Sequence, residues 1–478
     1  MTELLDDVIL TGAVRRSPSL EGYTVIRAET AADLEAYLRL RREVFVTEQG
    51  LFSGSDLDEV DEDPRRIVLL ARSDDGEVLG GVRLHPALHP ALHPAQPDAR
   101  DVGWWRGSRL AVKQDARQLL GVGAALVRAA CATAEQAGAL RFDATVQARN
   151  EGLFRRLGWV PRERIHLHDM THVVMEWPVQ RIRELSEATK SPLGDLVGAL
   201  VGHSTPGFRG DDGAPVPGSD LVAACDAILP SMVERDPEWA GWCAVLVNVN
   251  DLSAMGAQPV GLLDAIGARD ASFARRIVRG LAEAAQAWDV PVLGGHTQLG
   301  VPAALSLTAL GRAERPVPGG GGAPGDLLRL SADLGGGWRP GYRGRQWDSS
   351  SHRTSAQLRE LSGVVPALAP RAAKDVSMAG VVGTAGMLAE ASGCRAIVDV
   401  GAVPTPSAAS TADWLTCFPG FAMLTAEAPG RTEPELPGFL SSAVCGELVP
   451  GTGVGLRWPD GTVTDAIDHT VTGLGPAS

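Results

Sequence analysis

Residues 247–257 read V-N-V-N-D-L-S-A-M-G-A, a largely apolar run that contains an Asn-Asp pair and closes on a glycine turn. Three other motifs of the rear half place acids or glycines in a similar way: G-D-D-G-A at 210–214, L-V-A-A-C-D at 221–226 and V-L-G-G-H-T at 292–297. Carboxylates on tight turns suit hard cations, and magnesium usually bridges carboxylates to nucleotide phosphates. Each motif alone is a weak signal, because Asp and Gly are the commonest turn residues. Their order and spacing together are a far more specific signal.

The four motifs in this order resemble the superfamily of AIR synthase, thiamine-monophosphate kinase, the hydrogenase maturation factor HypE and selenophosphate synthetase. A fifth stretch, K-D-V-S-M-A-G-V-V-G-T at 374–384, resembles the family's D-V-S-D-G-G-L-x-G-T motif. The resemblance covers about residues 182–475 and implies bound ATP and Mg²⁺. The metal ligands that it implies are Asp211, Asp212, Asp226 and Asp251. The nucleotide-binding residues that it implies are Asn250, Asp375 and the turn Gly294, Gly295, His296 and Thr297.

Two departures from that family pattern bear on which of the superfamily's reactions the rear half could catalyse. His296 stands where the kinase branch has an aspartate, and Met378 with Ala379 replaces an Asp-Gly pair, so one expected acid is absent. Selenophosphate synthetases also need a reactive cysteine or selenocysteine and a lysine ahead of the first motif. Residues 182–210 contain Lys190 but no cysteine, which argues against selenide activation.

The front half contains the stretch G-S-R-L-A-V-K-Q-D-A-R-Q-L-L-G-V-G-A at 107–124, which ends a predicted strand and opens a predicted helix. Glycines there let the backbone approach a ligand, and the free N–H groups at a helix start can hold a pyrophosphate. An ordinary glycine-containing helix start is the alternative interpretation. The strand, the short loop and Q-x-x-G-x-G together resemble the acetyl-CoA signature of GNAT acetyltransferases.

The GNAT resemblance covers about residues 20–178. It is supported by N-E-G-L-F-R-R-L-G-W at 150–159, which resembles the helix that closes beside CoA, and by R-E-V-F-V-T-E-Q at 42–49, which resembles one GNAT branch. It implies that the backbone of Leu110, Ala111 and Val112 pairs with the pantetheine arm. The other cofactor-binding residues that it implies are Gln118, Gly121, Val122, Gly123, Ala124, Asn150 and Phe154.

Phe154 departs from the family pattern, because many members carry a tyrosine there as the acid for the departing thiolate. Acyl transfer to an amine also needs a base that removes a proton from the amine. Glu48 and Asp143 are the candidate bases. Each could equally be a helix cap or an ion-pair partner, since carboxylates with those roles are common.

The predicted fold class is α/β and α+β: a GNAT fold with a mixed central sheet, followed by a two-domain AIR synthase-like α+β module. The expected boundaries are a tail at 1–20, the GNAT-like domain at 21–180, a linker or first helix at 181–206, an ATP domain at 207–316, a Gly/Ser-rich loop at 317–351 and a C-terminal domain at 352–478. The predicted strands are 23–27, 66–72, 78–84, 107–112, 141–146, 173–177 and 395–400, and the predicted helices are 31–48, 119–137, 151–157 and 381–392. The repeat H-P-A-L-H-P-A-L-H-P at 85–94 is open to a metal-binding interpretation, but proline at every fourth position forbids the helix that would align its histidines. A loop insertion is the alternative.

Composition excludes several classes of partner. The net charge of −14 argues against a nucleic-acid binder or a protein of anionic membranes, because phosphates need a basic face. The six cysteines have no C-x-x-C spacing, so neither a zinc site nor a disulfide framework is expected. No signal peptide or membrane span is evident, and a cytoplasmic protein is expected.

These observations predict a bifunctional enzyme. One module would transfer an acetyl group from acetyl-CoA to a small amine, and the other would use ATP and Mg²⁺ to phosphorylate or activate an oxygen of a small metabolite. The order of motifs resembles a fusion type that accompanies nitrilase-type enzymes, which suggests nitrogen or nitrile metabolism. The resemblance also implies a homodimer through the AIR synthase-like domain. Two alternatives remain: an ATP-dependent enzyme whose GNAT domain only senses acyl-CoA, and a non-catalytic scaffold.

Overall fold

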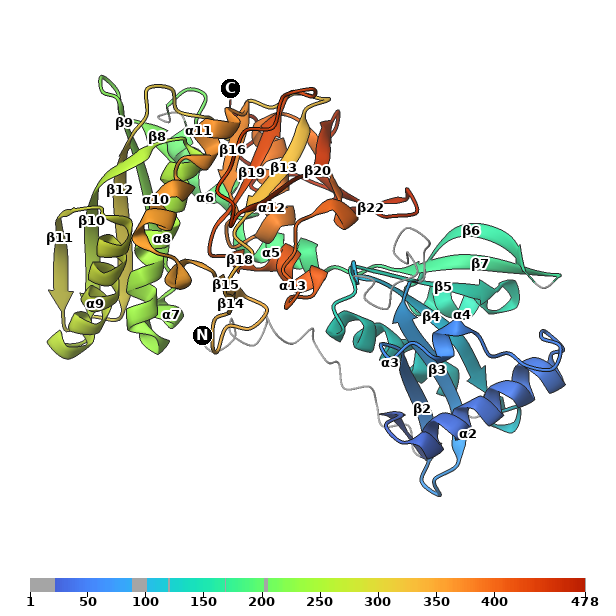
Figure 1. Ribbon diagram of the computed structural model, residues 1–478. Coiled ribbons are helices and arrows are strands. Elements are labelled where there is room, and N and C mark those ends of the chain that lie inside the picture. The colour runs from blue at the N-terminus through green and yellow to red at the C-terminus, as the bar shows by residue number, and fades with distance from the viewer. Residues whose placement is uncertain (1–21, 88–100, 119–120, 168, 202–204, 478) are drawn as a thin grey trace. The chain divides into compact units, whose positions relative to one another are not determined.

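The computed structural model describes residues 22–87, 101–118, 121–167, 169–201 and 205–477. The chain forms two compact units, each described by itself here: a front unit of residues 1–181 with 410–412, and a rear unit of residues 182–409 with 413–478 (Figure 1). Among these described segments, no helix combines the length and the apolar character that a membrane span requires.

The front unit is built on a seven-stranded sheet with the strand order β1-β2-β3-β4-β5-β7-β6. Its strands are β1 (Tyr23–Arg27), β2 (Ile67–Ser73), β3 (Val78–Pro86), β4 (Trp104–Val112), β5 (Arg141–Gln147), β6 (Val160–Leu167) and β7 (Met170–Trp177). Its helices are α2 (Ala31–Arg41), continued by a π-helical segment (Arg42–Glu48), α3 (Val122–Gln136) and α4 (Glu151–Arg156). Capping by Thr30 explains where α2 begins, because its side chain accepts a hydrogen bond from the Asp33 backbone N–H.

About halfway along strand β4, the alternation of core-facing and outward-facing side chains reverses. Trp105 faces the core under α3 before the change, and Leu110 and Val112 face it afterwards, so the core-facing positions switch from odd to even numbers. The switch coincides with a bulge in the β3–β4 pairing and with a left-handed φ of 51° at Arg109. Strand β4 pairs with β5 only as far as Gly107, opposite Ala144. The two strands therefore part at the bulge.

The rear unit contains two larger sheets. The five-stranded sheet has the order β11-β10-β12-β9-β8, and the seven-stranded sheet has the order β16-β19-β13-β20-β17-β21-β22. The strands of the first are β8 (Ala214–Pro215), β9 (Leu221–Ile228), β10 (Gln258–Ala268), β11 (Val292–Leu299) and β12 (Ala304–Arg312). Those of the second are β13 (Leu327–Ala332), β16 (Ala372–Asp375), β17 (Arg395–Asp399), β19 (Ala422–Glu427), β20 (Ser441–Val449), β21 (Val454–Arg457) and β22 (Val463–Ile467). A small sheet adds β14 (Gly337–Trp338), β15 (Gln346–Asp348) and β18 (Phe418–Pro419).

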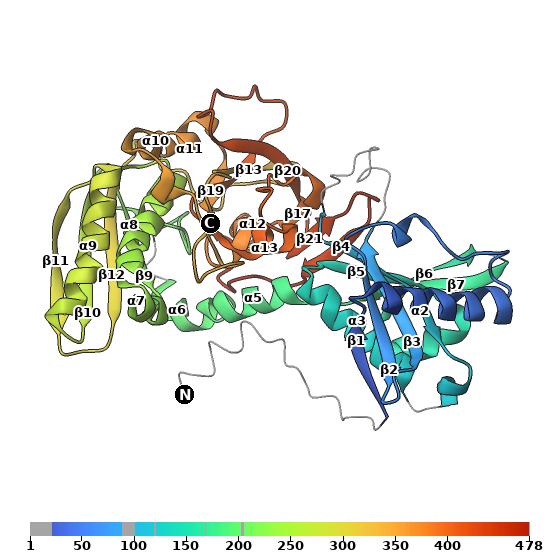
Figure 2. The same cartoon turned by 60° about the horizontal axis from the view of Figure 1, so that its bottom comes forward.

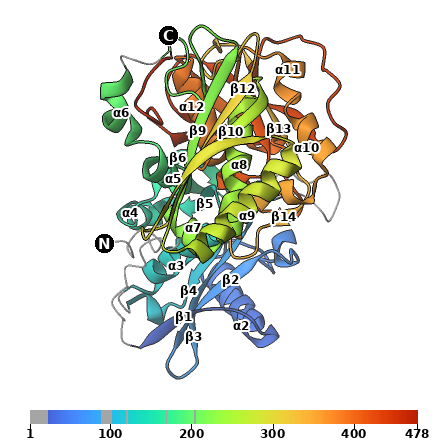
Figure 3. The ribbon, with the colours of Figure 1, turned by 90° about the vertical axis from the view of Figure 1, so that its left-hand side faces the viewer.

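Helices cover one face of each large sheet. Helices α8 (Pro237–Ala254) and α9 (Ala271–Trp288) lie along the five-stranded sheet (Figures 1 and 3), and α12 (Gly380–Ala391) packs on the seven-stranded sheet. Helices α5 (Arg181–Thr189) and α6 (Leu193–Val201) follow one another in Figure 2 and lead into the first sheet. The remaining helices are α7 (Pro230–Arg235), α10 (Ser355–Leu361), α11 (Val364–Leu368) and α13 (Thr411–Thr416).

The expectation of a Gly/Ser-rich loop over 317–351 is wrong in its middle part. Strand β13 lies in this interval, in the interior of the seven-stranded sheet between β19 and β20. Leu328 and Leu330 are fully buried there, and the polar Arg329 and Ser331 are paired with Glu427 and Ser442. Flanking glycines masked a strand whose polar side chains are satisfied inside the sheet. Strand β6 was also not predicted. The repeat at 85–94 begins with His85 and Pro86, which end β3, and its residues 88–94 lie outside the described residues.

Two glycines allow α8 and α9 to pack closely. A Cβ atom on Gly280 would lie 1.8 Å from the Glu238 carbonyl oxygen, and one on Gly241 would lie 2.3 Å from the Ile277 carbonyl oxygen. Gly280→Ala is therefore expected to force the helices apart and to lower the free energy of unfolding by at least about 1–3 kcal/mol. Urea unfolding measures the change.

The matched control is Gly198→Ala. Gly198 is an exposed glycine of α6, and no atom lies within 4 Å of the Cβ position. Alanine is the better helix former, so this variant should gain roughly 0.5–1 kcal/mol. Equal stability of the two variants would contradict the close packing of α8 on α9.

Candidate active sites

A buried lysine joins the two large sheets of the rear unit. Lys374, on β16, donates from Nζ to Asp211 Oδ1 at 3.1 Å, to Asp212 Oδ1 at 2.9 Å and to the Gly210 carbonyl at 3.3 Å. Burial opposes the charge, but Asp212 and Asp211 raise the pKa of Lys374 well above its usual value. The backbone N–H of Asp375 completes the contact by donating to Asp212 Oδ2 at 3.0 Å. We call this group the lysine clamp.

Asp211 is committed to the lysine clamp. Its Oδ1 accepts from Lys374 and from the Asp212 backbone N–H, and its Oδ2 accepts from the Gly319 N–H at 2.6 Å. The expected role of Asp211 as a metal ligand is therefore replaced here by a structural one. Asp212 accepts one hydrogen bond from Lys374 and one from the backbone N–H of Asp375.

Three further aspartates meet next to the lysine clamp: Asp226 on β9, Asp251 in the last turn of α8 and Asp375 at the end of β16. Burial raises the pKa of all three, and it places those of Asp251 and Asp375 well above the usual range. Repulsion adds to this effect, because Asp251 faces Asp375 and Asp226. The half-buried Lys190 partly offsets it for Asp226 and Asp375. We call these three residues the acid cluster.

The acid cluster fits a magnesium ion that is held partly by other ligands. Within the described parts of the chain, no three His, Cys, Asp or Glu side chains are grouped tightly enough to hold a metal ion by themselves. Magnesium retains several water or phosphate ligands when carboxylates bind it, so a closed protein cage is not required. The excess of negative charge and the oxygen donors are what such an ion needs.

Asn250 and the motif at 294–297, both expected to bind the nucleotide, have different surroundings in the structure. The buried Asn250 side chain donates from Nδ2 to the Gly420 carbonyl at 3.1 Å, so it fastens α8 to the start of β19. The expected turn at 294–297 is part of β11, an edge strand whose side chains are exposed. Gly295 lies in the same row as Asp226 but three strands away, about 14 Å across the sheet. Glycine is needed there because a Cβ would lie 2.4 Å from the Asp264 carboxylate.

The start of α3 in the front unit has the features of an anion site. Gly121 precedes the helix with a left-handed φ of 102°. Within the described residues, the first helical hydrogen bond runs from the Ala125 N–H to the Gly121 carbonyl, so the N–H groups of Val122, Gly123 and Ala124 have no helical partner there. Beside them, Leu110 to Val112 lie beyond the point where β4 parts from β5. This arrangement fits the pyrophosphate and pantetheine parts of CoA. Gln118 ends a short 3₁₀ turn (Asp115–Gln118) next to it.

Asn150 and Phe154 differ from each other in their surroundings. Asn150 is exposed at the start of α4. Phe154 is buried in the core, where its ring packs edge-on against Trp159 with centroids 5.3 Å apart. The structure thus gives Phe154 a packing role.

Neither expected base has the surroundings of one. Glu48 forms a two-pronged ion pair with Arg117, and this hydrogen bonding lowers the pKa of Glu48, which weakens it as a base. Asp143 is buried and accepts from Trp104 Nε1 at 2.6 Å and from Arg106 Nε at 2.8 Å. The sequence could not show this, because the partners lie 69 and 37 residues away.

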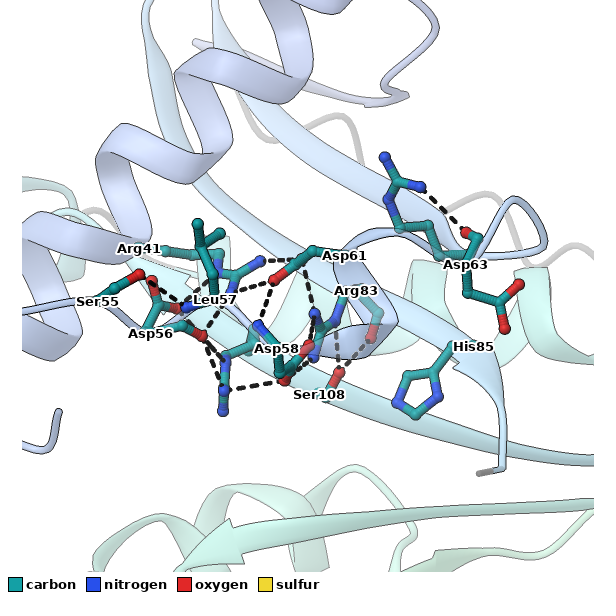
Figure 4. A network of polar contacts seen from close by, with 12 residues as sticks. Arg41, Ser55, Asp56, Leu57, Asp58, Asp61, Asp63, Arg83, His85 and Ser108 are labelled. Carbon is teal, nitrogen blue, oxygen red and sulfur yellow. Dashed lines mark hydrogen bonds and ion pairs between the residues drawn. The ribbon is translucent and has the colours of Figure 1, made fainter. Parts of the chain in front are cut away.

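A second group that the sequence did not reveal is an Arg–Asp network, shown in Figure 4. It consists of Arg41, Arg83 and Arg109 with Asp56, Asp58 and Asp61. Arg41 and Arg83 are almost fully buried, and each guanidinium contacts two of the acids. Because the charges balance and Arg109 is the bulge residue, the network holds the bulge of β4 and the loop around residue 58 in one arrangement.

Family models match most of both units. Residues 34–159 match the acetyltransferase (GNAT) family, residues 210–313 match the N-terminal domain of AIR synthase related proteins, and residues 323–434 match their C-terminal domain. An uncharacterized protein of Synechocystis sp. is 36% identical over 48% of this chain and 73% of its own length. The chain belongs to the AIR synthase-related family, with a GNAT domain in front. It is an enzyme, since both parts are of transferase type.

Two further relatives and one solved structure are similar to this chain. An uncharacterized protein of Methanocaldococcus jannaschii is 30% identical over 44% of this chain and 68% of its own length. The thiamine-monophosphate kinase of Caulobacter vibrioides is 32% identical over 43% of this chain and 62% of its own length. The T. maritima PurL structure shares the fold, with a TM-score of 0.50 and 16% identity over 63% of this chain and 54% of that one. The C-terminal family match begins at residue 323, ahead of the expected boundary at 352, because β13 belongs to that domain.

Asp251→Asn is expected to stabilise the protein at pH 8, by on the order of 1–3 kcal/mol, because it removes a buried charge that other acids repel. The unfolded pKa of aspartate is near 3.9, and the folded pKa of Asp251 is raised. Wild-type stability therefore falls as the pH rises from about 4 through the folded pKa. The advantage of asparagine should shrink as the pH falls toward 4. Urea unfolding between pH 4 and pH 8 measures it.

Asp220→Asn is the control for this comparison. Asp220 forms an exposed ion pair with Arg312, so its replacement should change stability by less than about 0.5 kcal/mol at any of these pH values. A loss of stability in Asp251→Asn at pH 8 would show that the Asp251 charge is stabilised in the fold.

Proposed function

We propose that the rear unit transfers a phosphoryl group from ATP to an oxygen of a small metabolite, with Mg²⁺ bound at the acid cluster. The observation that supports this most directly is the acid cluster itself: three carboxylates with raised pKa values, from elements of both large sheets, beside a clamp whose single lysine is already paired with two other aspartates. The kinase named among the relatives favours the same chemistry. A protein with only a structural use for these acids would be more stable with fewer of them.

The residues divide the work in this proposal. Asp226, Asp251 and Asp375 hold the ion, and Asp212 can reach it from the clamp. When bound, magnesium would neutralise charge on the transferred phosphoryl group. Lys374 cannot contact the nucleotide, since its donors are used within the clamp. Lys190 is the lysine close enough to Asp226 and Asp375 to bind a phosphate oxygen.

Asp226→Asn and Asp251→Asn are each expected to lower ATP turnover by at least about 100-fold. ADP release from purified full-length protein with MgATP, alone and with a pool of small metabolites, measures this. Asp220→Asn, away from the cluster, should keep turnover within about twofold. Because Asp251→Asn should be more stable than wild type, its loss of turnover would not reflect misfolding. Normal turnover in both cluster variants would refute the assignment.

For the front unit we propose acetyl transfer from acetyl-CoA to a small amine, supported by the start of α3 and the parted strands β4 and β5. The core position of Phe154 favours a second candidate, in which acetyl-CoA binds without turnover. Placement in the cytoplasm, where both cofactors are made, and a link to nitrogen or nitrile metabolism remain part of the proposal.

We further propose a homodimer through the five-stranded sheet. One face of this sheet packs on α8 and α9, whereas its other face and its edge strand expose large apolar side chains, namely Leu263, Val292, Leu293 and Leu299. Association of two such faces would bury them and would place the glycine motif of β11 at the interface.

Leu263→Glu is expected to convert the dimer into a monomer, because it places a charge in the proposed interface. Native mass spectrometry of the full-length protein measures the mass. The control is Val278→Glu, at an equally exposed valine on the outer side of α9, which should leave the dimer intact. A wild-type protein that is monomeric at micromolar concentration would refute the proposal.

A further inference from the structure

The side of the front sheet that faces away from α3 carries a row of polar residues. His85 on β3 lies opposite Arg106 on β4, and Arg106 lies opposite Asp143 on β5. Their neighbours along each strand, Leu84, Trp105 and Phe142, point into the core on the α3 side. The row crosses the sheet one residue before the last paired position of β4 and β5, Gly107 opposite Ala144, and so lies next to the parted strands that fit the pantetheine arm.

Arg106 is held with one edge of its guanidinium available. Its Nε donates to Asp143 Oδ1 at 2.8 Å, and one Nη donates to Thr145 Oγ1 at 3.1 Å. The other Nη makes no hydrogen bond within the described residues, and 37% of the side chain is exposed. Asp143, which orients it, is buried and anchored by Trp104. A guanidinium fixed in this way is a site for a carboxylate.

His85 provides an acceptor on the same side of the sheet. Its Nδ1 lies 2.8 Å from the Pro86 carbonyl oxygen, which can only accept, so the proton is on Nδ1 and the lone pair is on Nε2. No described residue donates to that Nε2. Figure 4 shows the ring apart from the Arg–Asp network, with no contact drawn to it.

The surrounding charges keep His85 neutral. Burial lowers the pKa of His85 to about 4, and Arg83 and Arg106 contribute in the same direction, while Asp58 opposes them and Asp63 lies near the ring. Nε2 therefore carries its lone pair at any pH above about 5.

We propose that His85 and Arg106 form the acceptor site of the front unit, and that its substrate is a small amine that also bears a carboxylate. Arg106 binds the carboxylate, and His85 Nε2 accepts the proton of the amine. This inference rests on the proposed acetyl transfer. Asp143 becomes a positioning residue, because it orients Arg106 and has no need to act as the base.

The step balances with the groups named. The amine nitrogen attacks the thioester carbonyl carbon, a C–N bond forms, and the C–S bond breaks with its electron pair going to sulfur. The proton lost by nitrogen moves to His85 Nε2 and is then passed to the departing thiolate, which leaves as CoA thiol. His85 ends the cycle neutral, as it began.

The test uses full-length protein, acetyl-CoA and matched amine pairs that differ in the carboxylate: glycine with glycinamide, and 4-aminobutyrate with 1-aminobutane. Release of CoA thiol measures the rate. We expect at least one carboxylated amine to be favoured about tenfold or more over its matched partner in the kcat/KM calculated for the unprotonated amine. Arg106→Gln should abolish that preference, mainly by raising the KM of the carboxylated amines, with a smaller effect on the amines that lack a carboxylate.

His85→Gln should lower kcat by about 100-fold or more, with the KM for acetyl-CoA unchanged. Its control is His172→Gln, which should stay within about threefold; His172 is a buried histidine on the same side of the sheet, on β7 opposite Gln147. Since His85 does not titrate near neutrality, the wild-type rate between pH 6 and pH 9 should follow only the fraction of unprotonated amine.

The outcomes separate this inference from the proposed function. Acetylation without carboxylate preference, or with full activity in His85→Gln, overturns the acceptor site and leaves acetyl transfer standing. Calorimetric titration with acetyl-CoA decides the remaining case: binding with no acetylation of any amine refutes both the acceptor site and acetyl transfer. Loss of activity in His172→Gln but not in His85→Gln would transfer the base to β7 and overturn the proposal.

Discussion

Burial of Lys374 between Asp211 and Asp212 is the interaction on which the rear unit depends. It joins the turn before β8 to β16, so residues 163 positions apart in the chain are fixed against one another. Removal of the lysine would leave two buried carboxylates beside an already negative cluster, which is one of the costliest changes a folded protein can undergo. The lysine is used up by Asp211 and Asp212, so the acid cluster beside them has only the half-buried Lys190 to offset its charge.

The two units thus handle buried charge in opposite ways. In the front unit, three arginines balance three aspartates, and the result is a rigid support for the bulge of β4. In the rear unit, Asp226, Asp251 and Asp375 share a place where their charges repel. A network in which every charge is paired holds the backbone in place, whereas a group of acids with too few cations favours the binding of a cation.

Local patterns in the sequence were enough for much of the fold. Alternation and helical periodicity predicted β1, α3, α12 and β17 to within a few residues, because each of these elements forms around one apolar face. Strand β13 was not predicted, since the signal that decides its position is the pairing of Arg329 and Ser331 with distant strands. The glycine motif at 294–297 was expected as a turn and instead lies within β11, because paired glycines are typical of turns and the strand partners of β11 are distant in the sequence.

The candidate sites were predictable in part for the same reason. The acids of the rear unit could be named from their motifs, but the clamp could not, since Lys374 and Asp211 are far apart in the chain. In the front unit the carboxylates Glu48 and Asp143 were named without the arginines that pair with them. His85 begins the repeat for which metal binding was one interpretation. Its position opposite Arg106 follows only from the register of β3 and β4.

The bulge at Arg109 reverses which positions of strand β4 face α3. Before the bulge, even-numbered residues such as Arg106 point away from α3, and after it, even-numbered residues such as Leu110 and Val112 point toward α3. A deletion or insertion of one residue on one side of the bulge would reverse the facing of the residues between that change and the bulge, and so would move side chains between the cofactor side and the acceptor side. Changes in the length of β4 are therefore tolerable only in pairs, and variation among relatives should be confined to the loops that flank it.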